Sequence, residues 1–175
     1  QANTPNQAFA KMEWVQGAYI YTCTGGLIAD TNPAQSNFFL TANHCVSRNN
    51  TAGNVQFYWK FATSSCNGTC PENAGWPYRT SGATVAATGK KGDFTLLHLN
   101  ANPPAGSVFL GSTNAPIANT NGAQVYRVSN PNFGPQVYSQ HNVDTNVGTC
   151  GGWPRGSWIY SRDITGAIDG GSSGS

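Results

Sequence analysis

Three residues in this sequence stand out because their types and order could do chemistry. His44 lies in FFLTANHCV, where an apolar run gives way to small and polar residues. Asp93 opens the apolar run DFTLLHL, and Ser173 lies in GGSSGS. An imidazole can act as a general base, a carboxylate can fix its tautomer, and an activated serine hydroxyl can attack a carbonyl carbon. In the order His, Asp, Ser, these residues predict nucleophilic catalysis.

The stretch IDGGSSGS, residues 168–175, has two interpretations. Its composition is typical of a flexible Gly/Ser linker. It also contains the pattern G-x-S-G, in which glycines allow a sharp turn that exposes the hydroxyl of Ser173 and directs the amides of Gly171 and Ser173 at one point. Such a pair of amides could bind an oxyanion. Ser172 is a weaker candidate nucleophile, because the G-x-S-G pattern is lost if it takes that role.

The other two histidines are expected to be structural. His98 lies inside the apolar run FTLLHL, and His141 lies in SQHNVD, which the sequence indicates to be a polar loop. His44 differs because it adjoins Cys45, whose disulfide would hold the backbone still, and a general base needs a fixed ring.

Five cysteines among few charges favour an extracytoplasmic protein. Cys23 and Cys45 lie in segments that could pair across adjacent strands, and a bridge closing such a loop stabilises by roughly 3 kcal/mol. Cys66 and Cys70, in CNGTC, are near enough for a local bridge, which leaves Cys150 unpaired in this chain. A zinc site is the alternative for these cysteines. It is disfavoured because no histidine lies near CNGTC and no second close pair exists, so no metal is expected.

The elements that must position these residues are short strands. Apolar runs rich in β-branched and aromatic residues are each followed by Gly, Pro, Asn or Ser: GAYIYT, NFFLT, NVQFYWKF, DFTLLHL, AQVYRV and GSWIY. No stretch of a dozen residues keeps a helical period, and none approaches a membrane span. The sequence therefore predicts an all-β sandwich or barrel and no membrane partner.

Composition narrows the function further. Charged residues make up 9% of the 175 residues and the net charge is +2, so no basic surface suggests binding to nucleic acid. The chain opens without a charged and then apolar leader, so a secretory signal is expected to have been removed or never present. With the cysteines, this favours a secreted, extracellular protein.

These motifs resemble a known family. LTANHC, GDFTLLHL and GGSSGS are similar to the histidine, aspartate and serine motifs of chymotrypsin-like serine proteases. CTGGLI, FLTANHC, the FYW strand followed by a cysteine, DFTLLHL and GSSGS resemble the bacterial lysyl endopeptidases within that family. The likeness runs from about Thr22 to Ser175.

The resemblance implies a role for each residue. His44 is then general base and acid, Asp93 holds its tautomer, and Ser173 is the acylated nucleophile, with oxyanion amides from Gly171 and Ser173. Cys23 and Cys45 match the family's bridge beside the catalytic histidine. The implied reaction is hydrolysis of peptide bonds in a protein or peptide substrate through an acyl-enzyme, with no metal or cofactor.

Two positions depart from the trypsin pattern. Ser172 stands where trypsin-like members carry an aspartate that pairs with the new N-terminal amine, so that activation switch cannot operate. Ala167 stands where trypsins carry the acid that binds Lys or Arg. Asp169 is the nearby acid, and we expect it to be an ordinary loop residue. A preference for Lys at P1, which the lysyl endopeptidase branch implies, would need an acid from a segment beyond Ser175.

The implied fold is two antiparallel six-stranded β-barrels. Residues 1–104 would form the N-terminal barrel with His44 and Asp93, and residues 105–175 would form part of a C-terminal barrel. A second polypeptide of roughly 50–80 residues is expected to complete it, and Cys150 could be bridged to that chain. The alternative function is a non-catalytic or cleavage-inactivated protein of the same fold that acts as a binding module.

Overall fold

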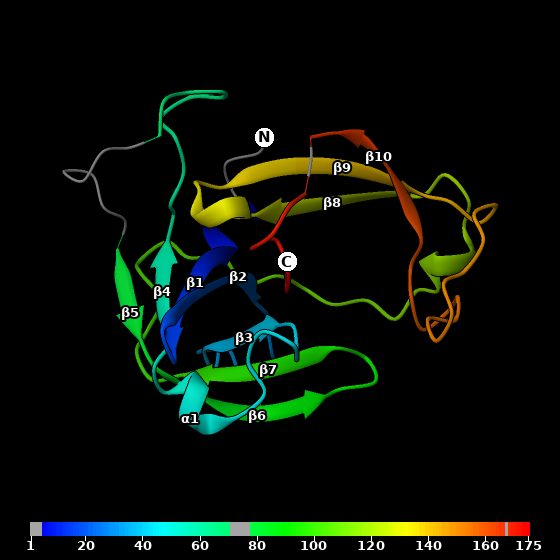
Figure 1. The fold of residues 1–175 in the computed structure, drawn as a ribbon. Coiled ribbons are helices and arrows are strands. Elements are labelled where there is room, and N and C mark those ends of the chain that lie inside the picture. Colours follow the sequence, from blue (N-terminus) through cyan, green and yellow to red (C-terminus); the bar gives the residue numbers. More distant parts are fainter. Residues whose placement is uncertain (1–4, 71–77, 167) are drawn as a thin grey trace. The chain divides into compact units, whose positions relative to one another are not determined.

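The computed structural model describes residues 5–70, 78–166 and 168–175. These residues form ten strands, one short α-helix and three short 3₁₀-helices (Figure 1). The elements in chain order are η1 Pro5–Ala8, β1 Phe9–Gln16, β2 Tyr19–Leu27, β3 Phe38–Thr41, α1 Asn49–Ala52, β4 Gln56–Trp59, β5 Arg79–Ser81, β6 Ala83–Gly89, β7 Phe94–Leu99, η3 Ile117–Asn119, β8 Gln124–Ser129, η4 Pro131–Phe133, β9 Val137–Val143 and β10 Ser161–Thr165.

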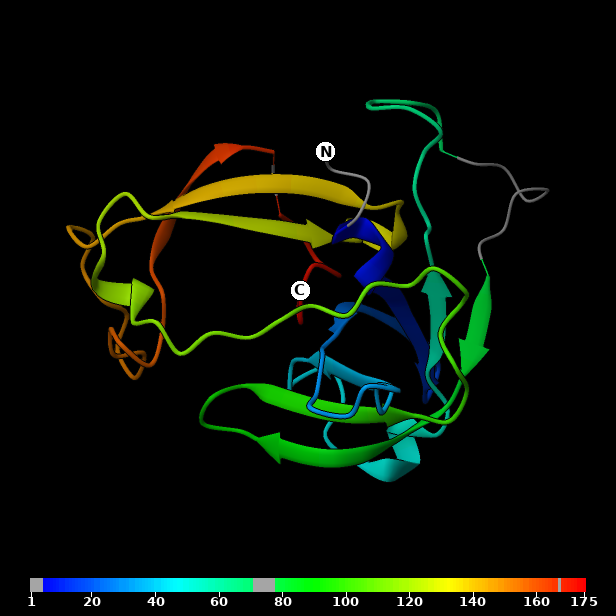
Figure 2. The same cartoon turned by 180° about the vertical axis from the view of Figure 1, so that it is seen from behind.

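The larger sheet has the order β5-β4-β1-β2-β3-β7-β6, and its pairs are antiparallel. Its two edge strands, β5 and β6, are separated in sequence only by Gly82. The sheet therefore curls until its edges meet there, and β5 and β6 act as one bent strand (Figure 2). Gly82 makes the bend at a φ of +77°, and its amide donates to the Val55 carbonyl.

The curled sheet encloses one hydrophobic core. Strand alternation sends every second side chain inward, so β1 contributes Ala10, Met12 and Trp14. The aromatic rings of Phe39, Phe57 and Trp59 pack against one another at centroid distances of 5.2–6.4 Å. The remaining fully or nearly buried members are Cys23, Leu27, Ala42, Cys45, Val46, Ala52, Val55, Ala83, Leu97 and Leu99.

The smaller sheet has the order β10-β9-β8. Its strands correct two expectations from the sequence. The run GSWIY, residues 156–160, is not a strand; β10 begins at Ser161, after a turn with an isolated bridge between Arg155 and Trp158. His141 does not lie in a loop, because the polar run around it alternates and pairs within β9.

The chain divides into two compact units. The first comprises Gln1–Ser112, Val128–Val137 and Asp169–Ser175, and the second comprises Thr113–Arg127 and Tyr138–Ile168. His44, Asp93 and the 168–175 stretch from Asp169 onward thus belong to the same unit. The expected domain boundary between residues 104 and 105 stays a prediction.

The all-β expectation is confirmed, because the described residues form a curled antiparallel sheet and a second small sheet. None of the helices in the described part of the chain has the length and apolar character needed to cross a membrane.

Candidate functional site

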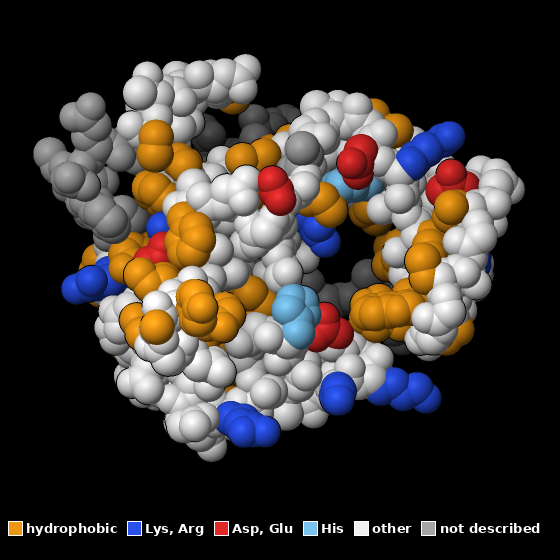
Figure 3. Space-filling model, viewed as in Figure 1, with side chains coloured by type: hydrophobic (Ala, Val, Ile, Leu, Met, Phe, Trp, Pro, Cys, Tyr) orange, Lys and Arg blue, Asp and Glu red, His pale blue; other side chains and the backbone are white. Residues whose placement is uncertain are grey.

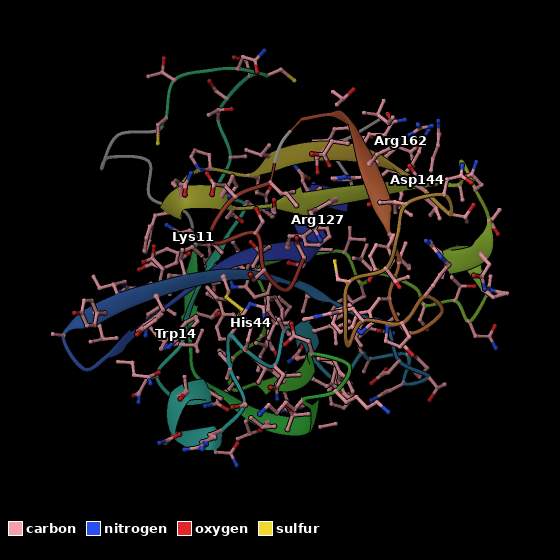
Figure 4. The ribbon with its side chains drawn as sticks, turned by 45° about the vertical axis from the view of Figure 1, so that its right-hand side comes forward. Lys11, Trp14, His44, Arg127, Asp144 and Arg162 are labelled. Atoms are coloured by element: carbon pink, nitrogen blue, oxygen red, sulfur yellow. A yellow bond between two sulfur atoms is a disulfide. The ribbon has the colours of Figure 1, made fainter. Side chains whose placement is uncertain are left out.

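His44 lies in a tight turn immediately after β3. The amides of Cys45 and Val46 both donate to the carbonyl of Ala42, which closes the turn. Cys45 and Val46 are buried at 6% and 1% exposure, whereas His44 is exposed. Cys45 is also bridged to Cys23 on β2. The backbone of His44 is therefore fixed from the core while its imidazole faces outward, close to Trp14 of β1 (Figure 4).

Asp93 holds His44 through both carboxylate oxygens. Its Oδ2 lies 2.7 Å from His44 Nδ1, and its Oδ1 accepts the His44 backbone N–H at 2.9 Å. Asp93 immediately precedes β7, which pairs with β3, so the sheet register brings the two residues together. Its φ of +48° is costly for a residue with a Cβ, and such strain is concentrated at functional sites. The double contact fixes the imidazole orientation and leaves Nε2 free to exchange a proton.

Thr24 of β2 anchors the 168–175 stretch. Its backbone N–H donates to the Ser173 carbonyl at 2.8 Å, and its hydroxyl donates to the Gly171 carbonyl at 2.8 Å. The same hydroxyl accepts the N–H of Asn130. A Cβ on Gly174 would lie 2.3 Å from the Thr24 carbonyl oxygen, so only glycine allows this close approach. The stretch is thus an anchored turn, and the linker interpretation is set aside.

The amides of Gly171 and Ser173 are oriented by the carbonyls on the far sides of their peptide planes. The Gly170 carbonyl accepts the Asn132 N–H at 2.6 Å, and the Ser172 carbonyl accepts the Ser175 N–H and hydroxyl. In a trans peptide the N–H points away from the carbonyl. Within the described residues, neither the Gly171 nor the Ser173 N–H has an acceptor, so both remain available to an external oxygen.

Ser173 and Ser172 differ in accessibility. Ser172 is 3% exposed and its Oγ accepts the Asp169 N–H. Ser173 is half-buried, and its Oγ has no hydrogen-bond partner within the part of the chain that the structure describes. A hydrogen bond between Ser173 and His44 is therefore not formed here. Catalytic contacts of this kind are often long before substrate binds.

Asp169 is engaged in the same stretch. Its carboxylate accepts the side-chain N–H of Asn132 at 2.8 Å and the Gly170 N–H at 2.7 Å. The hydrogen bond from Asn132, and to a smaller extent that from Gly170, lowers the pKa of Asp169 from its ordinary value of 3.8. The expected position of a specificity-determining acid, Ala167, lies outside the described residues.

A hollow opens beside His44. Its volume is about 550 Å³, and it is lined by residues from the ends of β1, the turn after β3 and α1: Trp14, Val15, Gln16, His44, Cys45, Ser47, Arg48, Asn50, Thr51 and Asn54. The buried Nε1 of Trp14 has no hydrogen-bond partner in the described part of the structure. Apolar side chains gather over the adjoining end of the β1–β2 hairpin, where Tyr19, Ile20 and Val15 are exposed (Figure 3).

The cysteines follow the prediction in part. Cys23 and Cys45 form the predicted bridge, with Cα atoms 6.3 Å apart. Cys66, Cys70 and Cys150 are exposed free thiols, so the predicted Cys66–Cys70 bridge is not formed. Cys66 and Cys70 are exposed and lie outside the strands, whereas Cys23 and Cys45 are both buried in the core. The one candidate metal cluster in the described residues is this disulfide with His44, and metals bind thiolates rather than bridged sulfurs.

A second Ser–His–Asp set lies within the second unit. His141 on β9 contacts Ser139 Oγ through Nε2 at 2.8 Å and the carboxylate of its β10 partner Asp163 through Nδ1 at 2.7 Å. Ser139 is completely buried and cannot meet a substrate in this structure. Burial also lowers the pKa of Arg127, an effect that the charge of Asp163 opposes. His141 is thus a buried, hydrogen-bonded link between two strands.

Three residues that support the 168–175 stretch carry no catalytic side chain. Thr24 and Asn132 contact the stretch directly, and Lys11 reaches it through Phe133 and Asn132. Lys11 offered one signal, since a charged residue in the run FAKMEWV is unusual for a buried strand. The hydroxyl of Thr24 and the left-handed conformation of Asn132 leave no such signal.

Known proteins share sequence and fold with this chain. The model of the family described as "Lysyl endopeptidase, C-terminal domain" matches residues 1–175. A lysyl endopeptidase from Pseudomonas aeruginosa is 33% identical over 174 residues. The match covers 96% of this chain but 36% of the relative, so the chain spans about a third of that protein's length.

Two solved structures show the same fold at low identity. The active form of the Rv3671c protease from M. tuberculosis aligns with a TM-score of 0.58 at 18% identity, covering 97% of this chain and 64% of that one. A serine endoprotease from Yersinia pestis aligns with a TM-score of 0.54 at 15% identity, covering 81% and 42%.

Proposed function

Because this chain belongs to the lysyl endopeptidase C-terminal domain family, we propose that it carries the active site of a serine endopeptidase. His44 is the general base and then acid, Asp93 holds it in the tautomer with a proton on Nδ1, and Ser173 is the nucleophile. The two hydrogen bonds between Asp93 and His44 are the observation on which the proposal chiefly rests. They leave Nε2 as the ring atom that takes the proton of the serine hydroxyl.

The chemistry follows from these positions. His44 removes the Ser173 proton as Oγ attacks the scissile carbonyl carbon, and the amides of Gly171 and Ser173 stabilise the oxyanion. His44 then protonates the leaving amine, and water attacks the acyl-enzyme by the same route. The hollow beside His44 offers room for part of the peptide chain. The choice of Ser173 rather than Ser172 is supported by the burial of Ser172.

A preference for Lys at P1, secretion and assembly with a second polypeptide remain parts of this proposal. The preference is supported by family membership and by the lysyl endopeptidase from P. aeruginosa. Secretion is supported by the Cys23–Cys45 disulfide, which an oxidising compartment favours. Peptides that differ only in Lys, Arg or Glu at P1 test the preference, and equal cleavage of all three would remove it.

A serine-directed fluorophosphonate tests the activity itself. We expect the full-length protein to gain one adduct, mapped by peptide mass spectrometry to Ser173. The variants H44A and S173A should not be labelled, whereas H98A should, because His98 is an exposed histidine on β7 outside the site. S172A should also be labelled. A wild-type protein that is folded, unlabelled and unable to cleave peptides would favour the non-catalytic binding module instead.

A further inference from the structure

Lys11 is a buried lysine that the proposed chemistry does not use. It lies in β1 at 4% exposure, and its ammonium contacts three kinds of group. Nζ lies 2.8 Å from the Glu13 carboxylate, donates to the Phe133 carbonyl at 3.1 Å, and stands 4.8 and 4.5 Å from the ring centroids of Tyr58 and Phe61. Burial of a cation is costly unless such partners compensate it.

The position of Lys11 in the sheet explains its reach. It is the register partner of Thr24 on β2 and of Tyr58 on β4, so these three side chains share one face. Met12 and its partner Cys23 point into the core on the opposite face. The face with Lys11 and Thr24 is therefore the face that holds the 168–175 stretch and its neighbour, η4.

The turn that Lys11 holds is strained. Asn132 has φ and ψ of 50° and 43°, and Phe133 has a φ of 60°, so two consecutive residues with Cβ atoms adopt the left-handed region. Phe133 is 45% exposed, so burial of its ring does not hold the turn. Hydrogen bonds must hold it, and the one from Lys11 to the Phe133 carbonyl reaches it from the sheet. Lys11 appears in Figure 4 beside this turn.

The other end of the turn contacts the candidate oxyanion hole. The Asn132 N–H donates to the Gly170 carbonyl at 2.6 Å, and the Asn132 side chain donates to Asp169 at 2.8 Å. The Gly170 carbonyl belongs to the same peptide plane as the Gly171 N–H. A displacement of the turn would therefore rotate that plane and misdirect the amide.

We propose that Lys11 is a positioning residue for the Gly171 amide, acting through Phe133 and Asn132 of η4. The inference rests on the proposed protease function, because only then does the direction of this amide matter for catalysis. If the Lys11–Glu13 ion pair had a structural role alone, a different result would be expected. Replacing a buried ion pair by apolar or neutral groups often leaves stability unchanged or raised, so in that case the loss of Lys11 should not alter turnover.

The test compares K11M/E13Q with K60M in the full-length protein. The double variant removes both charges and leaves no unpaired buried carboxylate. Lys60 is the matched control, because its Nζ also donates to a backbone carbonyl, that of Ala105 at 3.1 Å. Lys60 is exposed, and within the described residues it makes no hydrogen bond to η4. The measurements are kcat and KM on a peptide amide, and affinity for a peptide aldehyde and for the corresponding peptide alcohol.

We expect kcat of K11M/E13Q to fall at least about tenfold, as part of the 10²–10³-fold cost of losing an oxyanion donor. KM and alcohol affinity should stay within about twofold, while aldehyde affinity falls with kcat, because only the aldehyde adduct carries an oxyanion. The conservative variant K11R should recover part of the loss, and K60M should match the wild type. A folded K11M/E13Q with wild-type kcat and aldehyde affinity would overturn the proposal.

A second variant and hydrogen exchange apply if the double variant does not fold or the wild type is inactive. If K11M/E13Q does not fold, K11Q/E13Q takes its place, because the neutral glutamine amide keeps a polar group at position 11 but is too short to hold the Phe133 carbonyl as the lysine does. A folded K11Q/E13Q with wild-type kcat and aldehyde affinity would overturn the proposal. If the wild type neither labels nor cleaves, the proposed function fails. Hydrogen exchange of the 169–175 segment then decides: faster exchange in K11M/E13Q than in K60M supports positioning by Lys11, and equal exchange refutes it.

Discussion

Replacement of Thr24 by valine should damage both the fold and the candidate site, because one hydroxyl joins them. In the wild type this hydroxyl donates to the Gly171 carbonyl at 2.8 Å and accepts the Asn130 N–H at 2.9 Å. Thr24 and Asn130 have 0% exposure, and Gly171 is buried. Valine keeps the branched shape of the side chain, so the substitution opens no cavity and isolates the hydrogen bonds.

The magnitude follows from the two groups left behind. T24V strands one buried N–H and one buried carbonyl, each costing about 1–3 kcal/mol, so we expect the free energy of unfolding to fall by about 2–6 kcal/mol. T80V is the matched control: Thr80 Oγ1 accepts the Trp59 indole N–H at 2.9 Å in a buried setting away from the 168–175 stretch. It strands one donor and should cost about 1–3 kcal/mol.

The assay is urea unfolding of the two variants in the same full-length protein, together with kcat measured under conditions where both are folded. T24V should unfold at lower urea than T80V, and only T24V should also lose turnover, because only it releases the carbonyl of Gly171. Equal midpoints for T24V and the wild type would refute the hydrogen-bond reasoning. A folded T24V with wild-type kcat would refute the link to the site.

Gly82 and Asp169 should affect stability in different ways, the first through the backbone bend that closes the larger sheet and the second through the loss of unfolding free energy at acid pH. G82A should cost about 1–3 kcal/mol, since its φ is +77° and a Cβ would lie 2.7 Å from Asn100 Nδ2; G122A, with φ +79° and open space, measures the backbone part alone by urea unfolding. The folded pKa of Asp169 is depressed, so its contribution is present above its ordinary pKa of 3.8 and lost as pH falls through the folded value. D169N should therefore show a shallower loss of unfolding free energy below pH 3.8 than the wild type, and an unchanged acid limb would refute this.

The sequence predicted the strand content because alternation is local. Runs such as NFFLT and DFTLLHL place apolar residues on one face, and they became β3 and β7. GSWIY was misread because aromatic content alone does not distinguish a strand from a turn, and His141 was misread because a polar run can be a strand in which only alternate residues are buried. The closure at Gly82 depends on register between distant segments, which composition does not carry.

In the candidate site, too, local sequence patterns marked some residues and contacts between distant segments determined the others. His44, Asp93 and Ser173 carry chemistry in their side chains, so type and order were enough to select them. Asn132, Thr24 and Lys11 act through hydrogen bonds to backbone carbonyls of distant residues. Any residue has such carbonyls, so no local pattern marks which one will be held.

The hydrogen bonds around Ser172 hold a loop whose central residue is uncharged. Trypsin-like members, which the sequence resembles, carry an aspartate at this position that pairs with an N-terminal amine. Here Ser172 is buried and its carbonyl is held by Ser175, while Thr24 holds the residues on either side of it. These hydrogen bonds hold the loop without a charged side chain at position 172, and Lys11 of the larger sheet contacts the neighbouring η4 through the Phe133 carbonyl. The serine at position 172 is therefore consistent with a loop that the larger sheet holds in place through Thr24.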